Sequence, residues 1–514
     1  MPSNQRVYSS IPENLGGGRV GLLLLLFVMA LYMFHSAGFA AFAIVCASPL
    51  LLLMVILCLK YRMMVFWMLI AINFFVQWKN FPSTGIPISL FNEALELLLI
   101  ALAIIRVEEA RFEKLLNLMG LALAVWSTFC FLEVLNDTCG LGLNFGLWYT
   151  GARLISFQLV YAFVVFSLYI TTPKVLMRYL TVWACLSLFA ALWVWKQKYF
   201  GMTAAELAFI NGPGRVTHII AGGTVVRLFS VFSDAANYGI YTACASVAFL
   251  SIGITSKIWS HRILFGAIGL TCMLAMGPTG TRSATVCFLA GVGAYVVLSK
   301  SFKIAVPAAI ILGTLYFVLA FTKIGNGNAE IRRMRSAFDK EDASMGARYS
   351  NQAVMKKYLA DAPWGIGVGT NYGDVPPNNK FHRLSTMPPD SEYVYIWVHT
   401  GIIGITTFVI VNGIILLGAC IIIFLRIKSK SLQGIASGLT AAFMAYQLGG
   451  YANQVLMQFP NCLIFYGAMA IVYVLPSLEN DWNEYEAKIL EKQDERKRLR
   501  AEKRQASRAW LFRH

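Results

Sequence analysis

The sequence predicts an all-α polytopic membrane protein with about 12–14 transmembrane helices and one large extracytoplasmic loop between late spans. Of its 514 residues, 58% are hydrophobic and only 13% are charged. This composition is far more apolar than that of a soluble domain. Apolar runs of roughly 16 to 25 residues recur from Val20 to Leu475, and such runs can cross a bilayer core of roughly 30 Å as helices.

The apolar runs divide the chain in order. The candidate spans are 20–35, 37–59, 64–77, 88–105, 114–134, 155–171, 178–196, 237–255, 262–277, 283–299, 304–321, 396–424, 434–450 and 459–476. They predict an N-terminal segment (1–19), a bundle (20–321) with a polar outer segment (197–236), a large loop (322–395), C-terminal spans (396–476) and a charged tail (477–514). Residues 1–18 are mostly polar and no small-residue cleavage site follows, so we expect the first span to be retained.

The short loops predict which ends of the spans face the cytoplasm. Each loop after an even-numbered span through span twelve carries at least two basic residues: Lys60 and Arg62; Arg106, Arg111 and Lys114; Lys174 and Arg178; Lys257 and Arg262; Lys300 and Lys303; Arg426, Lys428 and Lys430. Under the positive-inside rule, these loops and both termini are cytoplasmic. The segments 197–236, 278–282, 322–395 and 451–458 then face outward, which makes the large loop extracytoplasmic.

The composition also argues against several classes of function. The net charge of +17 does not indicate nucleic-acid binding, because the basic residues cluster at helix ends as orientation signals do. The ten cysteines are scattered without a Cys/His cluster, so neither a disulfide framework nor a zinc site is predicted. Asp339, Glu341 and Asp342 lie close together but are typical of a solvated loop. We therefore expect no metal and no cofactor.

Arginines stand out on the predicted outer side. Arg215 and Arg227 lie in the segment 197–236, Arg282 lies in a tight turn before a span, and Arg348 opens an amphipathic stretch of the large loop. An arginine at membrane depth is costly unless it is paired or solvated, and guanidinium groups bind phosphate oxygens well. Together these arginines suit a diphosphate ligand. Alternatively, single arginines reach the lipid headgroups or pair with Asp234.

Two carboxylates, Asp390 and Glu392, lie just before the next span. A carboxylate at a helix N-terminus is stabilised by the helix dipole, so Asp390 or Ser391 is a candidate N-cap. A base that deprotonates a hydroxyl nucleophile is the functional alternative, and the two roles are compatible.

Two other stretches have ordinary structural interpretations. The run Gly365-x-Gly-x-Gly follows no predicted strand and faces outward, so we interpret it as a turn that lets the backbone pass close to the bundle rather than as a nucleotide loop. The tail from Glu479 to His514 contains Glu/Lys/Arg pairs at i,i+4 spacing. It is either a solvated cytoplasmic helix that lies on anionic membrane lipid through Arg496–Arg508, or a disordered tail.

Several motifs occur in a defined order. They are Arg227 before an Asn-containing span, Thr281-Arg282-Ser283, Arg348, Pro363-Trp364-Gly365-Ile366-Gly367-Val368-Gly369-Thr370-Asn371-Tyr372, Asp390-Ser391-Glu392-Tyr393, and Gly401-Ile402-Ile403-Gly404. In combination, this series resembles the O-antigen ligase and Wzy-type polysaccharide polymerase superfamily over roughly residues 200–425.

The resemblance implies a glycosyltransferase of lipopolysaccharide or exopolysaccharide biosynthesis in the cell inner membrane. Its donor would be an undecaprenyl-diphosphate-linked oligosaccharide, and its acceptor a hydroxyl on a glycan or on lipid A core. The resemblance assigns the diphosphate to Arg227, Arg282 and Arg348, whereas Arg215 has no clear counterpart. Arg282 is also a catalytic candidate, because a preorganised cation stabilises the charge that develops on the leaving diphosphate. Polysaccharide export and chain-length machinery are further expected partners.

One position departs from the resemblance. Ligases of this type carry His-Asn about eleven residues before the Gly of Gly-Ile-x-Gly, and here that position is Asp390. If the chemistry is kept, Asp390 takes the role of that histidine, together with Glu392. The departure favours a polymerase or related transferase over a ligase.

A transporter or flippase of polysaccharide or other solutes is the alternative from another class. Transporters of this kind show related halves, short loops and ionisable residues at the bilayer midplane. In this sequence, the polar residues gather on one side and in one large loop, and no related halves are visible, so we favour the transferase.

Overall fold

The computed structural model describes residues 21, 24–25, 27–29, 32, 49, 52–81, 88–108, 111–220, 225–300, 302–327, 329–336, 343–371 and 373–511. The chain divides into two compact units, Met1–Val65 and Phe66–His514. In the first unit, the described residues include the helical stretch 52–60 and the beginning of α2.

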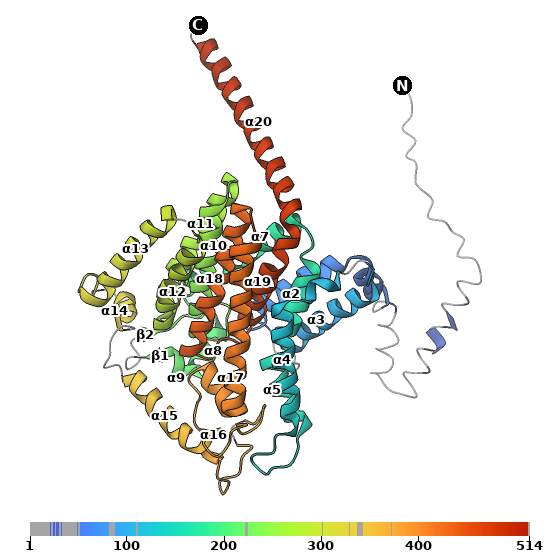
Figure 1. Cartoon of the computed structure of the whole chain (residues 1–514), viewed down its shortest axis with the longest axis vertical. Coiled ribbons are helices and arrows are strands. Elements are labelled where there is room, and N and C mark those ends of the chain that lie inside the picture. Colours follow the sequence, from blue (N-terminus) through green and yellow to red (C-terminus); the bar gives the residue numbers. More distant parts are fainter. Residues whose placement is uncertain are drawn as a thin grey trace, which may run out of the picture. The chain divides into compact units, whose positions relative to one another are not determined.

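The secondary structure is almost entirely helical (Figure 1). In chain order they are α2 (Arg62–Phe75), α3 (Ile88–Ile105), η1 (Phe112–Leu115), α4 (Leu118–Leu132), η2 (Glu133–Leu135), α5 (Phe145–Ala152), η3 (Arg153–Phe157), α6 (Gln158–Tyr169), α7 (Pro173–Tyr199), α8 (Ala204–Asn211), α9 (Arg215–His218), β1 (Ile219–Ile220), β2 (Val225–Val226), α10 (Ala235–Thr255), α11 (Trp259–Ala275), η5 (Gly277–Thr279), α12 (Arg282–Leu298), α13 (Phe302–Phe321), α14 (Ala329–Arg335), α15 (Ala343–Leu359), α16 (His382–Thr386), α17 (Glu392–Ile421), η7 (Ile422–Arg426), α18 (Lys430–Ala452), α19 (Asn461–Val474), η8 (Leu475–Leu478) and α20 (Glu479–Leu511). The short strands β1 and β2 pair antiparallel, with Ile219 opposite Val226.

The predicted class of fold, an all-α polytopic membrane protein, is confirmed. Within the described residues, seven helical stretches are long and apolar enough to cross a membrane, and residues 52–60 with α2 give an eighth if they count as one broken span. The seven are Leu118–Leu135, Phe145–Tyr169, Pro173–Tyr199, Ala235–Thr255, Trp259–Thr279, Glu392–Arg426 and Asn461–Arg500. The predicted spans 88–105, 283–299, 304–321 and 434–450 are also helices, although they are not in this set. The predicted span 20–35 and most of 37–59 lie outside the described residues.

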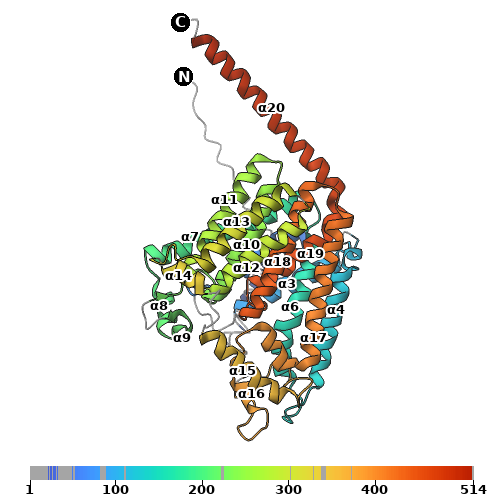
Figure 2. The ribbon, with the colours of Figure 1, turned by 60° about the vertical axis from the view of Figure 1, so that its left-hand side comes forward.

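Helix α10 is the central helix of the second unit. It packs against α11, α12 and α18, and these helices run alongside one another in both views (Figures 1 and 2). Its buried residues occur on every side, from Ala235 to Gly253. A helix that is apolar all round is expected in the interior of a bundle. On another side of the unit, α6 packs against α19 and α4 packs against α17.

Capping residues explain where two of these helices begin. At α7, the Thr172 side chain accepts a hydrogen bond from the Val175 N–H, and Pro173 occupies the first helical position. At α10, one carboxylate oxygen of Asp234 accepts hydrogen bonds from the N–H groups of Ala236 and Asn237, at 2.8 and 3.0 Å. Asp234 is therefore used as an N-cap at the segment that carries Arg227.

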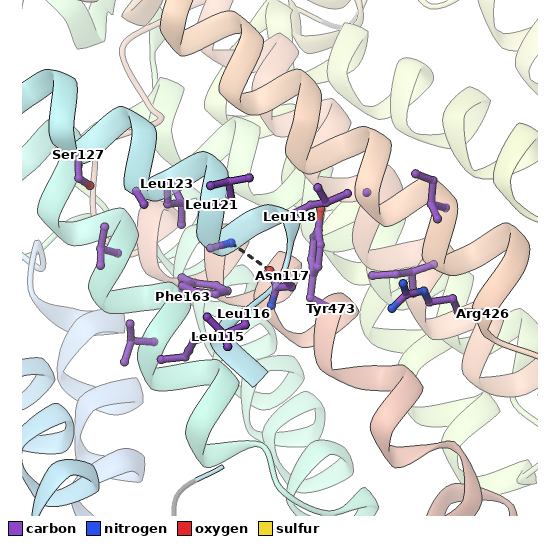
Figure 3. Close-up of a pocket in the computed structure, with 17 residues that line it drawn as sticks. Leu115, Leu116, Asn117, Leu118, Leu121, Leu123, Ser127, Phe163, Arg426 and Tyr473 are labelled. Carbon is purple, nitrogen blue, oxygen red and sulfur yellow. Dashed lines mark hydrogen bonds between the residues drawn. The ribbon is translucent and has the colours of Figure 1, made fainter. Parts of the chain in front are cut away.

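An apolar cavity of about 810 Å³ opens between α4, α6, α17 and α19 (Figure 3). Leu118, Leu121 and Phe163 are among the residues that line it, and its few polar groups include Arg426 and Tyr473. The cavity lies where α4 begins and where α17 ends. It offers no cluster of polar groups for chemistry, and the candidate site lies elsewhere.

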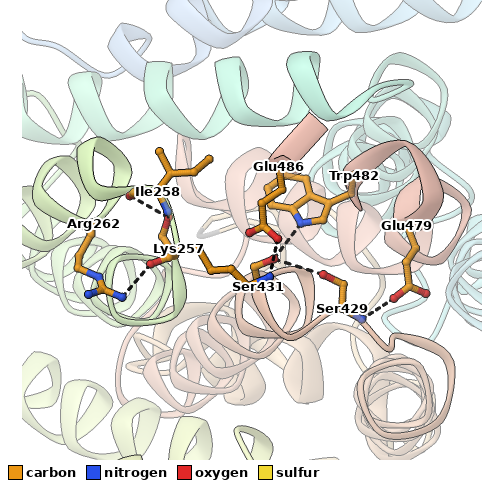
Figure 4. Close-up of polar contacts among 9 residues, drawn as sticks. Lys257, Ile258, Arg262, Ser429, Ser431, Glu479, Trp482 and Glu486 are labelled. Carbon is orange, nitrogen blue, oxygen red and sulfur yellow. Dashed lines mark hydrogen bonds and ion pairs between the residues drawn. The ribbon is translucent and has the colours of Figure 1, made fainter. Parts of the chain in front are cut away.

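The C-terminal helix α20 is anchored where α18 begins (Figure 4). A carboxylate oxygen of Glu479 accepts a hydrogen bond from the Ser429 N–H at 2.5 Å. The Trp482 indole donates to the Ser431 hydroxyl at 3.0 Å. One turn further along α20, Glu486 accepts a hydrogen bond from the Lys257 ammonium at 2.7 Å. Beyond Glu486, α20 extends away from the other helices of the unit (Figures 1 and 2). The tail is thus a helix over residues 479–511, and the disordered alternative is wrong for these residues.

Candidate functional site

Four arginines line one cavity of about 350 Å³, here called the arginine pocket. They are Arg227, Arg282, Arg333 and Arg348. They come from the segment before α10, the start of α12, α14 and α15, respectively. The end of α18 completes the wall with Tyr451, Ala452 and Asn453. Residues more than 100 positions apart in the sequence thus meet at the end of α18 that is remote from α20.

Arg227 is held by backbone and hydroxyl oxygens. Its Nε donates to the Thr279 carbonyl at 3.2 Å, and one terminal nitrogen donates to the Thr217 carbonyl at 3.0 Å. The other terminal nitrogen donates to the Thr281 hydroxyl at 2.9 Å. These contacts fix the guanidinium over the turn that precedes α12. Asp234, which could have paired with Arg227, instead caps α10.

Arg282 is placed by the turn between α11 and α12. The residue before Thr281 is Gly280, which has a φ of 55° and forms the sharp reversal. Arg282 is the first residue of α12. The neighbouring Ser283 hydroxyl accepts a hydrogen bond from the Asn453 amide at 2.7 Å, which joins the turn to the segment after α18.

Arg333 was not among the residues predicted from the sequence. It lies between Arg332, which donates to the Asn326 carbonyl at 2.5 Å, and Arg335, which donates to the Val318 carbonyl at 3.2 Å. These two neighbours tie α14 to the chain that enters it. The Nε of Arg333 donates instead to the Gly280 carbonyl, so its guanidinium reaches the arginine pocket. The sequence offered only an arginine-rich stretch, without a sign of which residue points inward.

The pocket concentrates positive charge. Burial is the main reason that the pKa of Arg227 is lowered from its usual value to about 10, and the charge of Arg333 is the next. Asp234 opposes this change and Arg282 adds to it. Crowded and partly desolvated like charges disfavour the charged form. A bound anion would relieve the repulsion, so the pocket has the electrostatics of an anion site.

Asp390 and Glu392 are two residues apart and have opposite environments. Asp390 is exposed, whereas Glu392 is buried with 3% of its surface exposed. A carboxylate oxygen of Glu392 accepts a hydrogen bond from the Leu456 N–H at 2.9 Å. Ser391 is the N-cap residue of α17, and its hydroxyl donates to the Gly450 carbonyl at 3.1 Å. Both residues 391 and 392 thus bind the chain around the end of α18, and the residues that line the arginine pocket include neither carboxylate.

The Gly-rich run packs between α5 and α17, as predicted for a turn that passes close to the bundle. A Cβ on Gly369 would lie 1.9 Å from the Leu147 carbonyl oxygen. A Cβ on Gly401, which has a φ of 63° within α17, would lie 2.0 Å from the Pro363 carbonyl oxygen. Hydrogen bonds from the Ile366 N–H to the Val398 carbonyl, at 3.0 Å, hold the two segments together. Only glycine allows these backbones to approach so closely.

A second cavity, of about 290 Å³, lies beside this junction and is here called the central cavity. Its wall includes Pro389, which precedes Asp390, together with His399 and Gln454. Both ring nitrogens of His399 lie close to carbonyl oxygens, Nε2 at 2.9 Å from Thr370 and Nδ1 at 2.8 Å from Tyr395. Arg215 is exposed on α9 and does not line the arginine pocket.

The fold and the site together define a polytopic helical membrane protein with an arginine-lined pocket at one end of its bundle. Residues 265–409 match the family model described as O-antigen ligase. This match extends from α11 into α17, and it includes Arg282, Arg333, Arg348 and Asp390. It confirms the resemblance to the O-antigen ligase superfamily, and it supports a glycosyl-transfer function of the ligase or polymerase type in the inner membrane. No curated protein matches the chain.

Proposed function

We propose that the protein transfers a glycan from undecaprenyl diphosphate to a hydroxyl acceptor on the outer face of the inner membrane. The acceptor is a second glycan, as in a polymerase, or lipid A core, as in a ligase. In this proposal the large loop is periplasmic and both termini are cytoplasmic. The observation that carries it is the convergence of Arg227, Arg282, Arg333 and Arg348 on one cavity within and beside the matched region.

The arginine pocket suits a diphosphate in charge and in size. Guanidinium groups form paired hydrogen bonds with phosphate oxygens. The pKa of Arg227 is lowered first by burial and then by the charge of Arg333, and a bound anion would stabilise the charged guanidinium. The cavity of about 350 Å³ falls in the range of small-ligand pockets, roughly 300–1,000 Å³. Arg227 and Arg333 are hydrogen-bonded to the turn before α12, so these two donors are fixed before the ligand arrives.

The proposed reaction is a single displacement at the anomeric carbon of the donor. The acceptor oxygen forms a bond to that carbon, and the bond from the carbon to the diphosphate oxygen breaks. The electron pair of the broken bond remains on undecaprenyl diphosphate, and the proton of the acceptor hydroxyl passes to a carboxylate. Arginines fixed around the diphosphate stabilise the charge most as it develops, which lowers the barrier. The anomeric configuration is inverted.

Asp390 is the proposed base. It is exposed at the start of α17 and follows Pro389, which lines the central cavity. Glu392 is assigned a positioning role, because it is buried and binds the backbone at Leu456. This assignment gives different roles to two carboxylates that were both catalytic candidates from the sequence. A base must reach the proton that it removes, and the exposed carboxylate meets that condition better.

The test uses a deletion strain that is complemented with variants expressed at equal levels. Arg282→Ala and Asp390→Asn should abolish the mature surface glycan and leave lipid-linked repeat units on the periplasmic side. Arg383→Ala is the control, because it removes one positive charge from the large loop but lies exposed on α16, outside the arginine pocket. It should retain wild-type glycan.

The location and length of the accumulated glycan decide between the alternatives. Repeat units that remain on the cytoplasmic side in the Arg282→Ala strain would refute the transferase and favour a flippase. In the deletion strain, single repeat units on the final acceptor would identify a polymerase. Long chains that remain on undecaprenyl diphosphate would identify a ligase.

A further inference from the structure

We infer that the acceptor glycan binds in a row of two cavities that leads away from the arginine pocket. The first is the central cavity, and the second, here called the distal cavity, lies between the 133–148 region and the Gly-rich run. The distal cavity has a volume of about 350 Å³. The inference rests on the proposed function and names the site of its second substrate.

The three cavities are neighbours through the residues that separate them. Asn453 lines the arginine pocket, and the next residue, Gln454, lines the central cavity. Thr370 lines both the central and the distal cavity. Pro389, in the wall of the central cavity, leads directly to Asp390. A chain of sugars that lies in this row would therefore pass the proposed base on its way to the donor.

The distal cavity has the opposite charge to the arginine pocket. Its polar lining includes the carboxylates of Asp137 and Asp374, the buried carboxyl group of Glu133, and the amides of Asn136 and Asn144. Carboxylates repel a diphosphate, so the donor has no reason to bind here. Hydroxyl groups donate hydrogen bonds to carboxylate oxygens, and such charge-assisted bonds are the stronger ones. The ligand chemistry that fits is an uncharged or cationic saccharide with many hydroxyl groups.

Glu133 supplies an independent sign of a missing ligand. It is buried, with 4% of its surface exposed, and lines the distal cavity. One of its carboxylate oxygens accepts a hydrogen bond from the Asn136 amide at 2.7 Å. The other carboxylate oxygen is buried and has no hydrogen-bond partner among the residues that the structure describes. A buried acceptor without a donor is costly, and a sugar hydroxyl in the cavity would remove that cost once a small turn of the Glu133 side chain brought this oxygen to the cavity surface.

A metal ion is a poorer occupant than a saccharide. In the described part of the chain, no group of three or more His, Cys, Asp or Glu side chains is arranged to hold a metal. Two of the carboxylates also already accept backbone hydrogen bonds, Asp137 from Leu141 at 2.8 Å and Asp374 from Asn371 at 2.6 Å. Each of the two therefore stabilises a turn in the wall.

The wall of the distal cavity is tied together across the sequence. The Asn136 amide donates to the Trp364 carbonyl at 2.8 Å, and the Asn379 amide donates to the Cys139 carbonyl at 2.7 Å. The close packing at Gly369 holds the same two segments. A wall that is fixed before binding loses little entropy when a flexible glycan binds.

The experiment measures the binding of two probes to the full-length protein in lipid nanodiscs. One probe is undecaprenyl diphosphate. The other is the oligosaccharide repeat unit released by mild acid from the surface polysaccharide of the host. Glu133→Gln should weaken oligosaccharide binding at least about tenfold and leave undecaprenyl diphosphate binding unchanged. Thr370→Val, where the two cavities meet, should act in the same direction.

A matched control is Glu96→Gln, an equally conservative change at another buried carboxylate that lines none of the three cavities. It should bind both probes as the wild type does. The inference is overturned if the wild type does not bind the oligosaccharide at millimolar concentration, or if Glu133→Gln binds it normally. It is also overturned if both probes lose affinity together in Glu133→Gln and in Thr370→Val.

The same measurements separate this inference from the proposed function. If Arg282→Ala leaves undecaprenyl diphosphate binding unchanged, the proposed donor site is wrong, whatever the oligosaccharide does. If Arg282→Ala weakens the binding of undecaprenyl diphosphate only, and Glu133→Gln weakens the binding of neither probe, the proposed donor site is supported and the inferred acceptor site is wrong.

Discussion

The sharpest prediction concerns Arg333, because the structure alone brings it into the arginine pocket. The change is Arg333→Gln, which removes the charge and keeps a polar side chain of similar length. A hydrogen bond to a charged group contributes about 1.5–3 kcal/mol, so the affinity for undecaprenyl diphosphate should fall roughly 10- to 150-fold. We expect the lower part of that range, since the loss of one charge also relieves the repulsion on Arg227.

The pH profile of binding gives a second readout that a merely structural role would not alter. Arg227 binds a diphosphate only while it is protonated. Once the terminal phosphate of the probe is fully ionised, the wild-type affinity should be level, and it should then fall as the pH rises through about 10, the lowered pKa of Arg227. Arg333 is the charged neighbour that lowers this pKa most. In Arg333→Gln, the pKa of Arg227 moves back towards its usual value, so the fall should occur at higher pH.

The assay is equilibrium binding of undecaprenyl diphosphate to the protein in nanodiscs over a range of pH. Arg332→Gln is the control, because Arg332 is adjacent in sequence but donates to the Asn326 carbonyl and does not line the pocket. An affinity of Arg333→Gln within about twofold of the wild type would refute the assignment. An unchanged pH profile would refute the proposed electrostatic coupling between the two arginines.

Three further predictions concern stability, measured by thermal unfolding in detergent. Gly401→Ala should prevent stable folding, because the added Cβ would lie 2.0 Å from the Pro363 carbonyl oxygen. Gly373→Ala is the control: it has open space around it and should cost only about 1–2 kcal/mol, because its φ is positive. Equal losses of stability in the two variants would contradict this prediction. Glu392→Ala should destabilise by about 1–3 kcal/mol through a lost acceptor, and Glu392→Gln by less. Burial lowers the pKa of His218 in the folded protein, so the His218 imidazole binds a proton more readily in the unfolded chain. The free energy of unfolding should therefore fall as the pH drops below about 6.5, the usual pKa of histidine. The variant His218→Gln should show a weaker dependence on pH.

The class of fold could be predicted from the sequence because it depends on composition and on the length of apolar runs. The number of spans does not follow from composition alone, because helices in the described part of the chain that coincide with predicted spans differ in length and in apolar content. Helix α18, for example, is mostly buried against its neighbours and is not among the helices that meet the length and hydropathy test. Apolar helices inside a bundle need not resemble ones that face lipid.

The candidate site was predictable where a motif marked it. Arg227, Arg282 and Arg348 were named from the sequence, and they line the same pocket. Arg333 could not be chosen from its arginine neighbours, because which side chain points inward is decided by the packing of α14. Arg215 is exposed and lies outside the arginine pocket, and nothing in its local sequence distinguishes it from the arginines that line the pocket.

Which of the two carboxylates at the start of α17 is buried could not be predicted from the sequence. Asp390 and Glu392 are separated by one residue, and both lie at the start of a helix. Their environments differ because Glu392 turns toward the segment at Leu456, which is more than 60 positions further along the chain. Local sequence does not record such a contact. Only the position of α18 and of the segment after it decides which carboxylate is buried.

The crowding of positive charge in the arginine pocket has a consequence for turnover. When the sugar departs in the proposed reaction, the carrier is left with a terminal phosphate that has gained an ionisable oxygen, and this adds negative charge at neutral pH. If the arginine pocket binds the diphosphate as proposed, its clustered positive charges would then hold the spent carrier more tightly than the donor. Release of undecaprenyl diphosphate, rather than bond formation, would then be the rate-limiting step, and free undecaprenyl diphosphate would compete with the lipid-linked donor for the arginine pocket.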